Sequence, residues 1–200
     1  MKSYHHGNLK QELINCACRL CERDGYTKLS IRSLAKESGV SQTAPYRHFE
    51  TKETLYASVA TEGFKKLSKA CHIDADKKIT KKHLVEIGCN YIEFGLKNAN
   101  TYDLMFGTAV GNFAEYPELL ESANSTYENM RLSFSKLASD SDEVIAFKCI
   151  TLWSMVHGLV GILRKVQVVG DDFDEGQLVV EFSNARSLSE AGNTYEVSGF

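Results

Sequence analysis

The sequence predicts an all-α fold of about nine helices: a three-helix head with a helix-turn-helix, a long fourth helix, and a helical body. Three observations predict it. Only 2 of the 200 residues are proline. Apolar side chains recur mainly at helical spacing, with little of the β-branched alternation that is typical of strands. In addition, two short helical patterns meet at Gly39 with no long loop between them.

The first two helices are predicted over residues 8–24 and 31–38. Ser30 is a suitable N-cap for the second, because its hydroxyl can accept from a free backbone N–H of the first turn. The apolar face of the second helix consists of Ile31, Leu34 and Ala35. The inward stripe of the first helix consists of Leu9, Leu13, Ile14, Ala17, Leu20 and Cys21.

The third helix is predicted after Gly39, which can take the left-handed conformation that ends a helix. Ser41 is its expected N-cap, and Val40 fills the angle between the two helices. Pro45 disturbs this assignment, since its missing N–H costs the bond back to the Ser41 carbonyl. Two alternatives therefore stay open: a distorted helix from Ser41, or a helix that starts near Pro45 with 41–44 as a loop.

Polar side chains cover this third helix where a soluble helix would usually carry Glu and Lys. Gln suits adenine, Arg suits guanine, and Thr can bond a base or touch the thymine methyl in the major groove. We therefore expect Gln42, Thr43 and Arg47 to reach base edges of DNA. A solvated surface charge is the alternative for Arg47.

Phosphate contacts are expected where helices begin, because free N–H groups and the helix dipole favour an anion there. Lys52 opens the fourth helix directly after Thr51, and Ser30 with Arg32 could act in the same way at the second helix. Ser41 completes the expected DNA contacts, and the arm over residues 2–10 could lie along the phosphates.

This part of the chain resembles the DNA-binding domain of the TetR family of transcriptional regulators. The resemblance covers residues 7–67, with the helix-turn-helix at about 30–49, and APYRHF resembles a variant in which proline replaces the more usual leucine. It implies that Tyr46 and His48 contact the DNA backbone. The matching residues are Leu34, Ala35, Gly39, Val40, Ser41, Tyr46, His48, Phe49, Lys52 and Leu55.

The charge is divided unevenly along the chain. The net charge is −3, yet residues 1–70 hold 12 Lys and Arg against 7 Asp and Glu. The remaining residues, 71–200, hold 11 against 19. A basic head on an acidic body is expected of a protein of which only one end meets phosphate.

The body is predicted over residues 72–200, after a fourth helix at about 52–71. Its helices are expected at 80–97, 100–107, 117–138, 140–166 and 172–188. The pattern Trp153-x3-His157-Gly158 resembles the C-terminal regulatory domain of one TetR subgroup. The resemblance implies small-molecule binding and a homodimer formed through about 140–166 and 172–188.

The helix predicted at 140–166 is apolar on more than one side, which favours a core on one side and a dimer partner on the other. Gly158 and Gly161 would permit a close helix crossing. One stripe consists of Leu152, Val156, Leu159 and Leu163, and its neighbour of Trp153, His157, Val160 and Arg164.

A ligand pocket in the body is expected among large aromatic and methionine side chains, a lining that suits an apolar or planar ligand. The same residues at helical spacing could be plain core, and His157 could be a satisfied core histidine. The candidates are Tyr91, Phe94, Tyr102, Met105, Phe106, Tyr127, Met130, Phe134, Trp153 and His157.

Neither a metal site nor a cofactor is expected. Cys16, Cys18 and Cys21 cannot converge on one ion, because Cys16 and Cys18 point roughly 200° apart on a helix. We interpret the 6 cysteines as small buried apolar residues, with thiol sensing as the alternative. A cytoplasmic location is expected, associated with the nucleoid when DNA is bound, since neither an apolar signal segment nor a run of about 18 apolar residues is present.

These observations together predict a sequence-specific transcriptional regulator and not an enzyme. We expect a repressor that binds a near-palindromic double-stranded operator as a homodimer and is released by an unidentified small-molecule effector. Two alternatives stay open: an enzyme, for which no catalytic cluster stands out, and a helical interaction module that has lost DNA binding.

Overall fold

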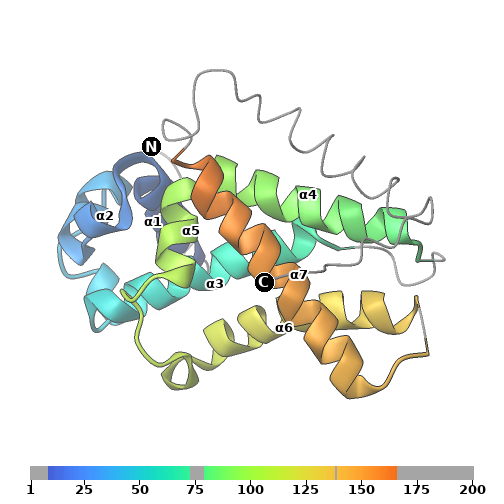
Figure 1. Cartoon of the computed structure of the whole chain (residues 1–200). Helices are drawn as coiled ribbons and strands as arrows, with labels where there is room; N and C mark the ends of the chain where they lie inside the picture. Colours follow the sequence, from blue (N-terminus) through green and yellow to red (C-terminus); the bar gives the residue numbers. More distant parts are fainter. Residues whose placement is uncertain (1–8, 73–78, 138, 166–200) are drawn as a thin grey trace.

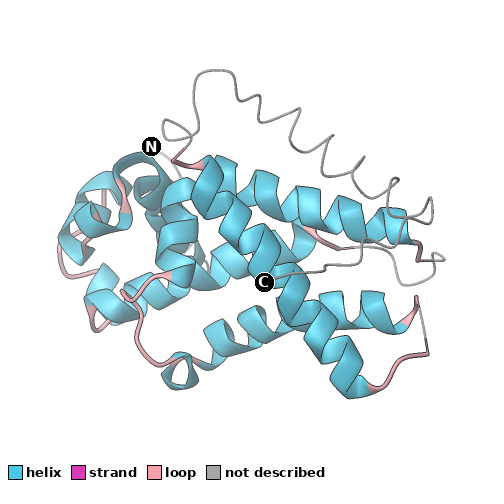
Figure 2. Ribbon diagram, viewed as in Figure 1, coloured by secondary structure: helices cyan, strands magenta, loops and turns pink. Residues whose placement is uncertain are grey.

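The computed structural model describes residues 9–72, 79–137 and 139–165, and within them every regular element is helical (Figures 1 and 2). Helices α1 and α2 lie at one end of the molecule, whereas α4, α6 and α7 make up the other, and α3 joins the two ends (Figure 1). The α-helices are α1 (Leu9–Asp24), α2 (Ile31–Ser38), α3 (Lys52–Ala70), α4 (Lys81–Lys97), α5 (Ala99–Phe106), α6 (Pro117–Ser135) and α7 (Asp142–Leu163). Short 3-10 helices lie at Tyr26–Lys28, Pro45–Arg47 and Phe113–Glu115.

The all-α prediction is confirmed, and of the about nine helices predicted for the whole chain the described residues contain seven α-helices, with a 3-10 helix at Pro45–Arg47 where the third was expected. The helix expected at 172–188, residue 8 of the first helix and nearly all of the arm at 2–10 lie outside the described residues. The predicted ends of two body helices are too late, since α6 stops at Ser135 and α7 at Leu163, whereas α4 ends at Lys97 as predicted. In α6, the Lys136 N–H bonds to the Leu132 carbonyl and Leu137 follows in a turn.

Local caps define α2 and α3, and the cap of α2 is the one that its sequence predicts. The Ser30 hydroxyl accepts from the Ser33 N–H at 3.0 Å, and Thr51 caps α3 in the same way through Thr54 at 3.1 Å. Gly39 ends α2 at φ 66°, in the left-handed region where a Cβ would be strained. These contacts fix the two helices on either side of the segment expected to meet DNA.

The predicted α-helix starting from Ser41 is not formed. Residues 42–44 are turns, and Pro45–Arg47 is a 3-10 helix, as in the alternative that starts the helix near Pro45. Proline has no N–H to donate to the Ser41 carbonyl, and the Ala44 N–H takes that carbonyl instead at 3.0 Å. Further bonds from His48 and Phe49, both to the Pro45 carbonyl at 2.9 Å, keep the segment coiled as far as Phe49.

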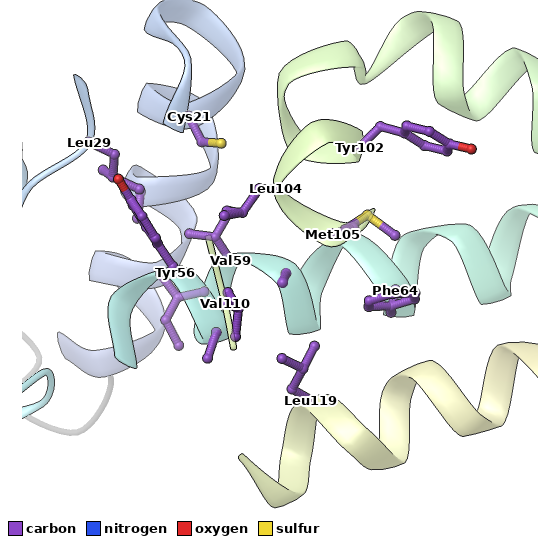
Figure 3. Close-up of a cluster of buried hydrophobic side chains, with 14 of the residues drawn as sticks. Cys21, Leu29, Tyr56, Val59, Phe64, Tyr102, Leu104, Met105, Val110 and Leu119 are labelled. Carbon is purple, nitrogen blue, oxygen red and sulfur yellow. The ribbon is translucent and has the colours of Figure 1, made fainter. Parts of the chain in front are cut away.

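Helix α3 runs through the middle of a core that joins head and body (Figure 3). In its first half Tyr56 lies beside Leu29 and Val59 beside Leu104 of α5, and further along Phe64 lies beside Met105 of α5 (Figure 3). Gly63 permits this approach, because a Cβ there would lie 2.5 Å from the Met105 sulfur. Head and body therefore share one continuous apolar core in the described chain.

A second close approach lies between α4 and α7. Gly95 faces Val160, and a Cβ on it would be 2.7 and 2.8 Å from the two Val160 methyl carbons. We expect Gly95→Ala to lower the free energy of unfolding by about 1–3 kcal/mol through overpacking, and thermal unfolding measures it. Gly88→Ala is the matched control on α4, since its Cβ would meet the nearest Val156 carbon at an ordinary 3.5 Å. Equal melting temperatures for the two variants would contradict this packing.

Helix α7 is 22 residues long and, by length and composition alone, apolar enough to cross a membrane. The expectation that no such segment exists therefore needs correction. One helix of this kind is weak evidence for a membrane span, and α7 packs on α4 and α6. Its inward residues combine members of both predicted stripes, and are Ile145, Cys149, Val156, Val160 and Leu163.

Candidate DNA-binding surface and ligand cavity

Most residues expected to meet DNA lie on the segment between α2 and α3 or at the start of α3, whereas Ser30 and Arg32 lie at the start of α2. Tyr46 is 48% exposed although it is a large aromatic residue. The Arg47 side chain makes no hydrogen bond or ion pair with any described residue, so its guanidinium is available to a ligand. The exposed members are Arg32, Ser41, Gln42, Thr43, Tyr46, Arg47 and Lys52, whereas Ser30 and His48 are half-buried.

Two of these side chains are held in place by the head itself. The Lys52 ammonium donates to the Thr27 carbonyl at 3.3 Å and lies 5.1 Å above the Tyr56 ring. The Ser30 hydroxyl is engaged as the cap of α2. Phe49 is 1% exposed and belongs to the core, so the exposed segment ends there.

A polar joint fastens α1 to α5. The Glu22 carboxylate accepts from the Thr101 N–H at 3.1 Å, the Thr101 hydroxyl at 2.8 Å and the Asn100 N–H at 3.3 Å. These N–H groups belong to the first turn of α5, which has no side-chain cap of its own. The Asn100 amide donates back to the Glu22 carbonyl at 2.8 Å. A head residue thus caps a body helix, where the helix dipole also favours its negative charge.

Removing this joint should destabilise the protein. We expect Glu22→Ala to cost about 1.5–3 kcal/mol of unfolding free energy, because hydrogen bonds to a charged acceptor are lost and the α5 N–H groups remain unsatisfied. Urea unfolding measures it as a lower midpoint. Glu22→Gln keeps one oxygen acceptor and should lose less; an Ala variant as stable as the Gln variant would show that the joint contributes little.

A cavity of about 450 Å³ lies in the body between α3, α4, α5, α6 and α7. Phe64 and Leu67 form its α3 side, and the Phe64 ring packs edge-on against Phe106 at a centroid distance of 5.4 Å. The other lining residues are Cys71, Ile87, Gly88, Tyr91, Met105, Phe106, Gly107, Val110, Gly111, Phe113, Leu120, Ala123, Asn124, Thr126, Tyr127, Met130, Leu152, Trp153 and Val156.

The structure divides the ten residues expected in a pocket. Those that line the cavity are Tyr91, Met105, Phe106, Tyr127, Met130 and Trp153. The other four do not line this cavity. Phe94 is buried in the core, and Phe134 lines a separate groove beside Phe147 and Met155. Tyr102 and His157 lie behind the wall, where they bond to each other at 2.5 Å.

These two residues belong to a polar network behind the Tyr91 side of the cavity. The Trp153 indole donates to the Tyr91 hydroxyl at 3.1 Å, which lies 3.1 Å from the Tyr102 hydroxyl and 3.2 Å from His157 Nδ1. Burial lowers the pKa of His157 below its ordinary value, so its neutral ring can accept at Nδ1. His157 is thus a satisfied histidine of the interior and not part of the lining.

Burial also bears on the thiols. It raises the pKa of Cys21 and of Cys71 to about 12, which keeps both thiols protonated and poorly nucleophilic at neutral pH. Cys16 and Cys149 are buried as well. Among the described residues, no group of His, Cys, Asp or Glu could hold a metal ion. The burial of these thiols agrees with the interpretation of the cysteines as small apolar residues.

Comparison with known proteins now identifies the family. A family model of "Bacterial regulatory proteins, tetR family" matches residues 13–59, and a model of "Tetracyclin repressor-like, C-terminal domain" matches residues 84–179. The two models together cover well over half of the sequence. This chain belongs to the TetR family. It therefore belongs to a family of DNA-binding transcriptional regulators with a helix-turn-helix domain.

Individual relatives agree with a TetR fold. The chain is 25% identical to the nucleoid occlusion factor SlmA of Aliivibrio fischeri (strain MJ11) over 132 residues, 65% of this chain and 66%, just under two thirds, of that protein. A protein of unknown function from Rhodococcus sp. RHA1 superposes with a TM-score of 0.74 at 21% identity, covering 92% and 96% of the two chains. A TetR variant from Acinetobacter baumannii AYE in complex with minocycline superposes with a TM-score of 0.60 at 18% identity, covering 96% of this chain and 99% of that chain.

Some important residues of this TetR protein were not expected from its sequence. Phe64 and Leu67 follow the apolar pattern of α3, which gives no sign that they leave the head core to line a cavity. Glu22 and its partners at 100 and 101 are far apart in the sequence, so no local pattern connects them. One signal was present: α5 begins without a side-chain cap, and its N–H groups needed an acceptor from elsewhere.

Proposed function

We propose that this protein is a repressor that binds a near-palindromic operator as a homodimer and leaves it when a small molecule occupies the body. The course of α3 carries the proposal. This helix begins at Lys52, directly after the exposed segment 42–47, and its Phe64 and Leu67 side chains line the cavity. One helix therefore connects the expected DNA contacts with the ligand site.

A second connection runs through α5. Its first turn is bonded to Glu22 of the head, and its Met105 and Phe106 side chains line the cavity. A ligand that favours another position of α5 or α3 would favour another separation of the two heads in a dimer. DNA is then released by a shift in population between two arrangements, each with its own affinity for the operator.

The related proteins support both partners. Proteins of the TetR family bind DNA and act as dimers with small-molecule ligands. The neighbour from Acinetobacter baumannii is in complex with minocycline, a small molecule. In the present chain we propose that Gln42, Thr43 and Arg47 contact bases, whereas Ser30, Arg32, Ser41, Tyr46, His48 and Lys52 contact the DNA backbone.

A selection of genomic fragments bound by the full chain tests the proposal. We expect a few enriched near-palindromic sites upstream of genes, bound with an affinity that falls steeply as salt rises, because phosphate contacts release counterions. Fluorescence anisotropy at several salt concentrations measures the slope. No salt-sensitive specific binding to any enriched fragment would overturn the proposal and favour a helical interaction module.

A further inference from the structure

The cavity contains no ionisable counter-charge. Among the described residues, none of those that line it is Asp, Glu, Lys, Arg or His. The lining side chains Cys71 and Tyr91 stay neutral at physiological pH, since burial raises the pKa of each to about 12. A charged group inside this cavity would lose its hydration without gaining a partner, which is costly in an apolar site.

Most polar groups near the cavity already have partners. Trp153, Tyr91, Tyr102 and His157 can donate in one direction, from the indole N–H to the Tyr91 oxygen, then to the Tyr102 oxygen, and finally to the histidine ring. The Thr126 hydroxyl donates to the backbone carbonyls of Ser122 and Phe64. Neither chain of bonds leaves a strong donor directed at a ligand.

Two lining side chains differ from these. Asn124 and Tyr127, three residues apart and therefore neighbours on one face of α6, make no hydrogen bond with any described residue. Asn124 is exposed and Tyr127 is half-buried, so they lie toward the solvent-facing rim of the cavity. The interior beyond them is aromatic and aliphatic, with Phe64, Phe106 and Trp153 among its walls.

We propose that the cavity takes an uncharged aromatic compound of two or three rings, whose one hydrogen-bonding group meets Asn124 and Tyr127 at the α6 rim. The size follows from the volume: an apolar cavity of about 150 Å³ in another protein accepts one benzene, and this one measures about 450 Å³. The proposal rests on the proposed function for its role as an inducer, but the binding itself requires no DNA.

The test compares two dyes of the same ring skeleton. N-phenyl-1-naphthylamine is neutral, whereas 8-anilino-1-naphthalenesulfonate adds a sulfonate beside the bridging nitrogen, where it cannot stay outside while the rings enter. Titration of the full chain should quench Trp153, the single tryptophan, with an affinity at least about tenfold higher for the neutral dye. Equal or tighter binding of the sulfonate would overturn the proposal.

Variants locate the binding. Ala123→Phe fills the cavity and should abolish quenching by the neutral dye, whereas Ser125→Phe, on an exposed position of α6 outside the lining, should not. Asn124→Leu should weaken binding of the neutral dye by about 3- to 10-fold, as expected for one lost hydrogen bond. Because Asn124 is exposed, we expect this variant to fold. Undiminished binding to both Ala123→Phe and Asn124→Leu would place the dye elsewhere and sink the proposal.

These measurements separate the two proposals. The dyes are titrated without DNA, so dye selectivity with no operator would overturn the repressor proposal and leave the ligand class standing. If the protein binds an operator but its cavity prefers the sulfonate dye, the repressor proposal stands and the proposed ligand class is overturned.

Discussion

Phe147→Glu should convert a dimeric protein into a monomer and weaken specific operator binding by about 10²- to 10⁴-fold, the range over which joining two modules raises affinity. Phe147 is 73% exposed on α7, and Val144, Met155 and Ile162 on the same side of the helix are 42%, 42% and 55% exposed. A patch of this kind on a regulator is expected to meet a partner. A glutamate buried in this patch by a dimer partner would be unpaired and costly.

The glycines of α7 support this assignment. A Cβ added at Gly158 or Gly161 would meet no described atom within 4 Å, so both face open space on the same side as Phe147. Glycine in a helix costs about 1 kcal/mol relative to alanine, which a close crossing with a second helix can offset. A dimer through this surface would present two heads to an operator whose half-sites lie one helical turn, about 34 Å, apart.

Sedimentation equilibrium and anisotropy on one operator fragment measure the two effects together. Phe147→Leu is the control, because it keeps an apolar side chain and should stay dimeric with nearly unchanged affinity. A Glu variant that remains dimeric would remove α7 from the interface. A monomer that binds the operator as tightly as the parent protein would show instead that dimerisation is not needed for recognition.

The sequence predicts this structure well where the cause is local. Ser30, Gly39, Thr51 and Pro117 stand where their helices begin or end, because a cap or a fixed φ acts within a few residues. The segment around Pro45 shows the limit. Its missing N–H was evident, but the choice between a distorted α-helix and a turn depends on which carbonyls the neighbours bond, and that is decided in three dimensions.

The cavity shows a second limit. Helical spacing indicates which side chains share a face, and so which large residues of α4 to α7 can face inward together. It does not indicate which interior they reach: Trp153 lines the cavity, whereas His157, one turn later, bonds to Tyr102 behind it. The difference depends on the crossing of α4, α5 and α7, which Gly95 permits and no local pattern specifies.

The second large effect concerns DNA. Arg47→Ala should lower operator affinity by about 5- to 150-fold, corresponding to about 1–3 kcal/mol for a bidentate base contact, and should relax the preference at one position of the site. The free energy of unfolding of the variant should stay the same, since the Arg47 side chain has no described partner to lose. Anisotropy on the operator, on single-base variants and on random DNA measures the affinity and the base preference, and thermal unfolding measures the stability.

Lys52→Ala provides the contrasting case. The Lys52 ammonium is positioned over Tyr56 and against the Thr27 carbonyl at the start of α3, where a phosphate is favoured. Its loss should weaken every sequence alike and reduce the salt slope by about 1. Arg19→Ala, an exposed arginine of α1 outside the expected surface, is the charge-matched control. If Arg47→Ala weakened random DNA as much as the operator, Arg47 would be a phosphate contact, and base recognition would have to rest on Gln42 and Thr43.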